Sequence, residues 1–167
     1  MRFESEFVVE RPAEEVFADL ADARRMPEWM PEFVSVEKLG DGPIGCGTEF
    51  CCKAARRPAT WTFTWSEYVP GRRLAWEGDL KTPVQRRGSY TLVRNGGEST
   101  TVRVAVEPRP RGPARFIVPL LKAFVGRHVR RDAERLRRWL GGALGGAWLA
   151  DAAEVFDAVA AALPVAA

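Results

Sequence analysis

The sequence predicts an α+β fold in which one seven-stranded antiparallel sheet is covered on its apolar face by a long helix near the C-terminus. Short segments with alternating polar and apolar residues follow one another, separated by Gly, Pro and Asn, which is typical of an antiparallel meander. A later segment repeats its apolar residues at helical spacing, and it is long enough to cover a sheet. With 167 residues, the chain has the size of one domain.

The predicted elements begin with a strand over residues 2–10, in which polar and apolar residues alternate. Pro12 and the acidic residues that follow it predict a short helix over 13–20. Prolines bound a second helical turn over 24–31. Six further strands are each expected to end at a turn signal, and they cover residues 33–39, 47–55, 60–69, 73–79, 85–94 and 98–107.

Apolar residues at intervals of three and four predict the long helix over about 113–141, ended by Gly141 and Gly142. A further apolar stripe predicts an amphipathic helix in the tail. The chain is therefore divided into a main domain, 1–143, and a helical extension, 144–167. Three roles stay open for the extension: docking on its own domain, a homodimer contact, or a plug over a ligand site.

Composition and charge argue against several functional classes. The net charge of +3 is too small to predict a nucleic-acid partner, and acidic residues interrupt the arginines of the long helix. No segment of about 18 residues is continuously apolar, so we expect no membrane span, and the N-terminus has no signal-peptide pattern. Cys46, Cys51 and Cys52 are odd in number and lack zinc-site spacing, which favours a reducing cytoplasm. The sequence predicts no metal and no cofactor.

Four local sequences carry a resemblance to a known superfamily. They are PAEEVF at 12–17, MPEWMP at 26–31, GPIGCGT at 42–48 and EYVPGRRLAW at 67–76. Together with the element order, they resemble the START-like (SRPBCC) superfamily and its polyketide cyclase/dehydrase branch over residues 3–140. The resemblance implies a helix-grip fold with an apolar cavity between sheet and helix. It implies no particular reaction, because the superfamily includes cyclases, aromatases, lipid carriers and plant hormone receptors.

Large apolar residues on the predicted inner faces are the candidate walls of that cavity. Flat aromatic side chains suit planar or polycyclic ligands. The alternative is that these rings pack on one another and leave no room for a ligand. The candidate ligand-binding residues of this kind are Trp29, Phe50, Trp61, Phe63, Trp65, Trp76, Leu92, Ile117, Leu121 and Phe124.

Polar candidates are few. His128 lies beside the apolar face of the long helix and Tyr90 points inward from its strand, so both are candidates for proton transfer in aldol cyclisation or dehydration. The alternative for His128 is a residue at the boundary of the helix with its polar edge in water, and the alternative for Tyr90 is an ordinary strand aromatic. Glu67 continues the face of Trp65 and is a weaker candidate for the ligand site. Arg86 is a candidate for an acidic ligand, although such a residue is more often a solvated surface group.

The sequence thus predicts a protein that binds a small hydrophobic molecule, aromatic or polyketide-derived, and leaves open whether it is an enzyme. A polyketide cyclase or aromatase is the catalytic version of this hypothesis. A carrier, a sequestering self-resistance protein or a sensor is the non-catalytic version. Titratable groups that converge inside the site would favour catalysis, whereas a purely apolar lining would favour binding alone.

Overall fold

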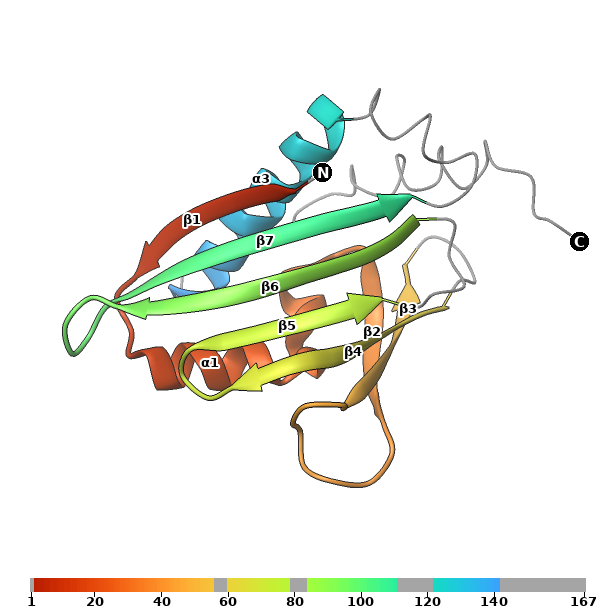
Figure 1. The fold of residues 1–167 in the computed structure, drawn as a ribbon, viewed down its shortest axis with the longest axis horizontal. Helices are drawn as coiled ribbons and strands as arrows, with labels where there is room; N and C mark the ends of the chain where they lie inside the picture. Colours follow the sequence, from red (N-terminus) through yellow and green to blue (C-terminus); the bar gives the residue numbers. More distant parts are fainter. Residues whose placement is uncertain (1, 56–59, 79–83, 111–121, 142–167) are drawn as a thin grey trace, which may run out of the picture.

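The computed structural model of the chain describes residues 2–55, 60–78, 84–110 and 122–141 (Figure 1). The predicted ligand residues Ile117 and Leu121 lie outside these ranges, as does the predicted tail helix. Phe124 belongs to the first turn of the long helix, and its side chain is also outside the described part. Within the described ranges, no helix combines the length and apolarity that a membrane crossing requires.

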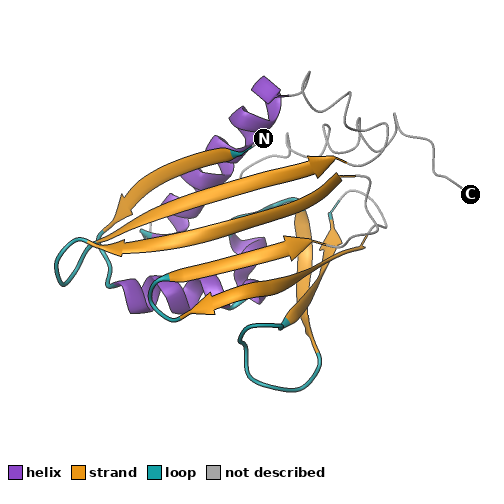
Figure 2. Cartoon of the chain, in the orientation of Figure 1, coloured by secondary structure: helices purple, strands orange, loops and turns teal. Residues whose placement is uncertain are grey.

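Strands dominate the described chain, and the helices lie near its two ends (Figure 2). In chain order the elements are β1 (Phe3–Val9), α1 (Ala13–Ala21), the short 3-10 helix η1 (Ala23–Glu28), β2 (Phe33–Leu39), β3 (Glu49–Ala54), β4 (Thr60–Val69), β5 (Arg73–Gly78), β6 (Val84–Arg94), β7 (Thr100–Pro110) and α3 (Lys122–Leu140).

The seven strands form one antiparallel sheet with the order β1-β7-β6-β5-β4-β3-β2, so β1 and β2 are its edges. In Figure 1, α1 and α3 lie on the same side of this sheet, behind it. The predicted fold class, a seven-stranded antiparallel sheet covered by a helix near the C-terminus, is confirmed. The strand bounds agree closely with the prediction, although β7 continues to Pro110, beyond its expected end at residue 107.

The helix α3 covers the sheet through a row of apolar residues at intervals of three and four. Val129, Ala133, Leu136 and Leu140 are buried, whereas the arginines of the opposite side are exposed. The last turn is tied to the N-terminal part of the chain, because Arg11 Nη1 donates to the carbonyl oxygen of Leu140 at 3.2 Å. This contact satisfies a carbonyl at the helix end and places a positive charge there.

The helix α1 is held against the sheet by an aromatic side chain. Trp65 of β4 is almost completely buried, and its Nε1 donates to the carbonyl oxygen of Ala21 at 3.1 Å. Val16 and Phe17 of α1 are also buried in the same core. The sheet and the first helix therefore share one apolar core, with a hydrogen bond that satisfies the otherwise buried indole N–H.

The strand register assigns side chains to the two faces of the sheet. Tyr90 of β6 lies opposite Leu74 and Val104, and these three buried residues face the helices. Trp76 lies opposite Trp65 on the same inner face. Leu92 is buried in the same core, two residues along β6 from Tyr90.

A bulge in β4 changes the face on which Glu67 lies. The register of β4 with β5 shifts between Trp65 and Glu67, so the expectation that these two residues share a face is wrong. Glu67 Oε2 instead accepts a hydrogen bond from Arg73 Nε at 2.7 Å. Tyr68 takes the inner position and packs edge-on against Phe17, with 5.1 Å between the ring centroids.

Two glycines on the inner face make room for indole rings. A Cβ atom added at Gly88 would lie 2.7 Å from the ring of Trp76 and 2.8 Å from the carbonyl oxygen of Ala105. A Cβ atom at Gly78 would lie 2.9 Å from the ring of Trp61. All three distances are shorter than van der Waals contact, so each ring lies directly over the backbone of a strand.

We expect Gly88→Ala to lower the free energy of unfolding by about 1–3 kcal/mol, because the new methyl group displaces the Trp76 ring and overpacks the face. The measurement is urea unfolding followed by tryptophan fluorescence. Gly97→Ala is the matched control, since nothing lies within 4 Å of a Cβ atom there. Equal stability of the two variants would contradict the assigned position of Trp76.

The three thiols are expected to react at very different rates. Cys46 is exposed, Cys51 is half-buried and Cys52 is buried, and burial raises the pKa of Cys52 to about 12. Because the thiolate is the reactive form, iodoacetamide should label Cys46 first and Cys52 only after unfolding. Peptide mass spectrometry after timed labelling measures this order, and early modification of Cys52 in native protein would refute it.

Candidate functional site

An aromatic cluster lines the inner face of β3, β4 and β5. Phe63 is at its centre, with ring centroids 5.3 Å from Phe50, 5.3 Å from Trp61 and 5.4 Å from Trp65. Trp76 completes the cluster, edge-on to Trp61 at 5.7 Å. These contacts arise because the residues alternate along neighbouring antiparallel strands and therefore share a face.

The members of this aromatic cluster differ in exposure. Phe50, Phe63 and Trp65 are almost completely buried, so the ring-packing alternative describes them well. Trp61 and Trp76 keep part of their surface accessible. Trp29, which follows η1, is also a buried core residue. Among the aromatic candidates whose side chains the structure describes, Trp61 and Trp76 therefore retain surface for a further contact.

Trp61 also contacts a charged residue and, outside the cluster on β3–β5, the ring of Phe33. The guanidinium carbon of Arg86 lies 4.8 Å from the Trp61 ring centroid, in cation–π geometry. Phe33 stacks on Trp61 with 6.0 Å between centroids and nearly parallel planes. Burial lowers the pKa of Arg86, while the negative charge of Glu32 opposes this change. Arg86 is therefore a half-buried residue on the inner side of the sheet, beside Trp61.

A row of polar residues runs along one flank of α3, beside its buried apolar row. His128, Asp132 and Arg135 occupy positions separated by four and three residues, so they project from the same side of the helix. His128 Nε2 lies 3.5 Å from Asp132 Oδ2. Arg135 Nη1 donates to the other oxygen, Asp132 Oδ1, at 3.2 Å. Asp132 is therefore held between a histidine and an arginine.

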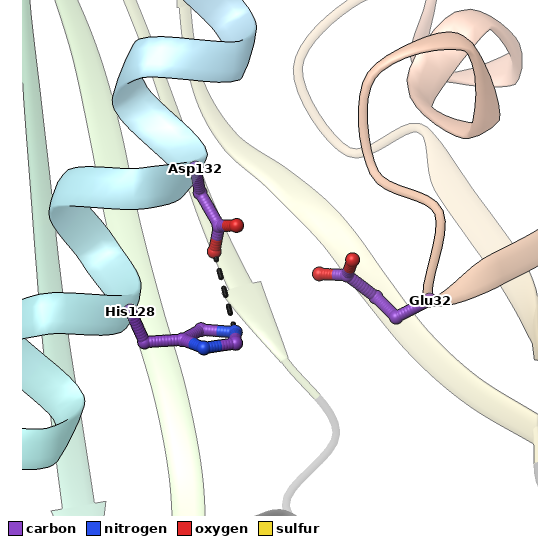
Figure 3. A group of neighbouring side chains, drawn as sticks. All are labelled: Glu32, His128 and Asp132. Atoms are coloured by element: carbon purple, nitrogen blue, oxygen red, sulfur yellow. Dashed lines mark ion pairs between the residues drawn. The ribbon is translucent and has the colours of Figure 1, made fainter. Parts of the chain in front are cut away.

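Glu32 faces this row from a different element (Figure 3). It immediately precedes β2, and its carboxylate points toward His128 and Asp132. One polar atom from each of Glu32, His128 and Asp132 lies within 4.8 Å of the other two. Glu32 Oε2 is buried and accepts no hydrogen bond from the residues that the structure describes. We call Glu32, His128 and Asp132 the polar triad.

Burial dominates the electrostatics of the polar triad. It raises the pKa of Asp132 to about 6, although the charge of Arg135 opposes this change. Burial also raises the pKa of Glu32, and the nearby negative charge of Asp132 adds to the effect. For His128, burial lowers the pKa, while the charge of Glu32 opposes this change. Desolvation thus favours neutral forms of all three groups.

Tyr90 belongs to the same neighbourhood. It is buried on the inner face of β6, where burial raises the pKa of its hydroxyl and the charge of Asp132 adds to this effect. The hydroxyl therefore remains protonated near neutral pH and can donate a hydrogen bond. The polar triad and Tyr90 together provide hydrogen-bond donors, hydrogen-bond acceptors and groups that exchange protons.

The sequence pointed to only part of this arrangement. The structure places the candidates His128 and Tyr90 near Asp132, one of the acidic residues that interrupt the arginines of the helix. The spacing of His128 and Asp132 on one helix carried a signal for this pairing. For Glu32 no local signal existed, because only the fold brings the segment before β2 opposite α3. The spacing of the three residues along the chain gives no metal-site motif, since two of them lie on α3 and the third precedes β2.

Comparisons with known proteins agree with this fold. Residues 1–141 match a family model described as polyketide cyclase/dehydrase and lipid transport. No curated protein matches the sequence.

Solved structures with the same fold include the Zhui aromatase/cyclase from Streptomyces sp. R1128, with 22% identity, a TM-score of 0.68, and coverage of 86% of this chain and 93% of that one. A START superfamily protein from Mycobacterium smegmatis has 17% identity and a TM-score of 0.64, and the match covers 86% of this chain and 99% of that one. The di-domain ARO/CYC BexL of the BE-7585A biosynthetic pathway has 21% identity and a TM-score of 0.68. The match covers 83% of this chain but only 45% of BexL. By its family-model match, this chain belongs to the polyketide cyclase/dehydrase and lipid transport family.

Proposed function

We propose that the chain binds a small aromatic or polyketide-derived molecule between the inner face of the sheet and α3, and promotes its cyclisation or dehydration there. One observation carries this proposal: accessible aromatic surface and convergent polar groups lie on the same side of the sheet. Phe33 links them, because it stacks on Trp61 and directly follows Glu32 in the chain. Family membership and the aromatase/cyclase neighbours support this class of ligand.

Binding would draw on the aromatic surface of Trp61 and Trp76. Transfer of an apolar molecule from water onto such a surface is favourable by about 25 cal/mol per Å² buried. The flat indole rings suit a planar ligand, and Arg86 beside Trp61 suits a ligand with an acidic or carbonyl oxygen. A small number of polar groups then sets the orientation of the ligand.

The chemistry would follow from folding a flexible poly-β-keto chain against this surface. In an aldol cyclisation, a base removes a proton from a methylene carbon, and that carbon forms a bond to a ketone carbon whose oxygen takes up a proton. Dehydration then removes this hydroxyl and a neighbouring proton as water. Neutral His128 or a carboxylate of the polar triad is suited to accept the methylene proton, and Tyr90 is suited to hydrogen-bond the ketone oxygen.

A non-catalytic carrier is the second candidate function. It is favoured by the close packing of Phe50, Phe63 and Trp65, which makes the wall rigid and apolar. Binding alone would need the aromatic surface but no proton transfer by Tyr90 or His128. The two candidate functions therefore differ in the effect of substitutions at these two residues.

Binding is tested by titration with a hydroxylated anthraquinone such as emodin, which should quench the tryptophan fluorescence saturably. We expect Trp61→Phe to weaken binding by about tenfold, since a lost aromatic contact is worth about 1 kcal/mol or slightly more. Trp139→Phe is the matched control, because Trp139 Nε1 donates to Glu28 Oε2 at the end of α3 and takes no part in the aromatic cluster. An absence of saturable quenching, or an equal effect of the two substitutions, would count against the binding site.

Catalysis is tested with a poly-β-keto thioester formed in situ by a minimal polyketide synthase, with the cyclised products measured by mass spectrometry. We expect His128→Ala to slow cyclisation by about 10²–10⁴-fold, as is usual when a proton-transfer group is removed. Tyr90→Phe should slow it by about 10²–10³-fold if its hydroxyl stabilises the developing oxyanion. Emodin binding should be retained in both variants.

The control for the catalytic test is Glu37→Gln, which removes an exposed carboxylate that pairs with Lys53 on the outer part of β2 and β3. Unchanged cyclisation in His128→Ala and Tyr90→Phe, with emodin still bound, would reject the enzyme and leave the carrier.

A further inference from the structure

The polar triad brings two carboxylates close together in a buried setting. Asp132 and Glu32 each present an oxygen within 4.8 Å of the other, and Glu32 Oε2 has no hydrogen-bond donor among the described residues. Two ionised carboxylates at this separation repel each other, and burial strengthens the repulsion. A cation bound between the two carboxylates would relieve this repulsion.

We propose that Glu32, His128 and Asp132 are the three protein ligands of a divalent first-row transition-metal ion, held between α3 and the segment that leads into β2. The polar triad offers one nitrogen and two oxygens to such an ion. Three protein ligands leave at least one coordination position for water or for a carbonyl oxygen of a ligand, which is typical of catalytic metal sites.

The spacing of the helical pair fits this role. Ligand atoms about 2.0–2.2 Å from a zinc ion are roughly 3.4 Å apart at a tetrahedral angle. The observed 3.5 Å between His128 Nε2 and Asp132 Oδ2 agrees with that separation. The Glu32 carboxylate faces this pair from the segment before β2, with an oxygen within 4.8 Å of both ligand atoms, so it would complete the site once its side chain moved toward α3.

The donor set limits the choice of ion. Imidazole nitrogen favours zinc, iron, cobalt, nickel or copper, whereas calcium and magnesium prefer sites made of oxygen alone. Two carboxylates beside the imidazole are compatible with zinc, cobalt, iron and manganese. Among the residues that the structure describes, no cysteine sulfur belongs to this group of ligand atoms, so Cys52 is not part of the site.

The arginines around the polar triad have two opposite effects on metal binding: one orients a ligand, and their charge repels a cation. Arg135 binds Asp132 Oδ1 and leaves Oδ2 directed at His128, which is how an outer residue orients a ligating carboxylate. The positive charges of Arg135 and Arg86 also act on Glu32, and they lower the affinity of the site for a cation. We therefore expect a weaker site than the same three ligands would form without the arginines.

This inference goes beyond the proposed function, with which it shares residues. With an ion bound, His128 and the carboxylates would be ligands, and the cation would polarise a ketone oxygen in place of a proton donor. Tyr90 would keep its hydroxyl for the substrate. Metal binding is measured directly and without substrate, so its failure leaves the emodin and cyclisation experiments to decide the proposed function.

The experiment titrates the full chain, freed of metal by dialysis against a chelator, with Co²⁺, whose visible d–d absorption appears when it binds to protein ligands. We expect saturation at one ion per chain and displacement by Zn²⁺. His128→Ala, Asp132→Asn and Glu32→Gln should each weaken Co²⁺ binding by at least about tenfold, since even outer residues of metal sites contribute about 10–100-fold.

Glu134→Gln is the matched control, because Glu134 is a carboxylate on the same helix that pairs with Arg137 and Arg138 outside the polar triad. It should bind Co²⁺ as the unchanged chain does. His128→Gln replaces His128→Ala if circular dichroism shows that the alanine variant is unfolded. The proposal is overturned by the absence of saturable Co²⁺ binding, by equal binding in the triad variants and Glu134→Gln, or by a thiolate charge-transfer band that places the ion on a cysteine.

Discussion

The packing of α3 against the inner face of the sheet is the interaction on which the site depends. Leu136 and Leu140 are almost completely buried in the core shared with the sheet, and Val129 and Ala133 continue the buried row toward the N-terminal end of the helix. Because this apolar row fixes the rotation of the helix about its axis, it also fixes the flank that carries His128 and Asp132. The residues that stabilise the fold therefore also set the direction of the polar groups.

Burial of the polar triad is unfavourable for folding, and this is a reason to assign it a role in function. Burial of titratable groups opposes folding unless each group gains a partner, and Glu32 Oε2 has no hydrogen-bond donor among the described residues. Asp132 is better compensated, since His128 and Arg135 flank its two oxygens. A buried carboxylate oxygen without a hydrogen-bond donor among the described residues is a feature that folding alone does not require, and perturbed groups of this kind gather at functional sites.

Sequence patterns predicted most of the fold because its elements depend on local periodicity. The alternation in β4 placed Trp61, Phe63 and Trp65 on one face, and this face was confirmed. The same reasoning failed at Glu67, because a bulge adds one residue to the strand and reverses the faces that follow. A bulge depends on the pairing of two strands, so alternation within one strand does not reveal it.

The site was harder to predict than the fold, because its parts come from distant segments. Glu32 and Asp132 meet only after the sheet has formed and α3 has packed on it (Figure 3).

Glu32 and Phe33 are adjacent in the chain, so a single peptide bond joins the polar triad to a ring that packs on the aromatic cluster. Because Phe33 stacks on Trp61, a ligand that displaced the Trp61 ring would act on the residue next to Glu32. Occupancy of the aromatic wall and occupancy of the polar triad would then be thermodynamically linked, and each would change the affinity for the other by the same factor.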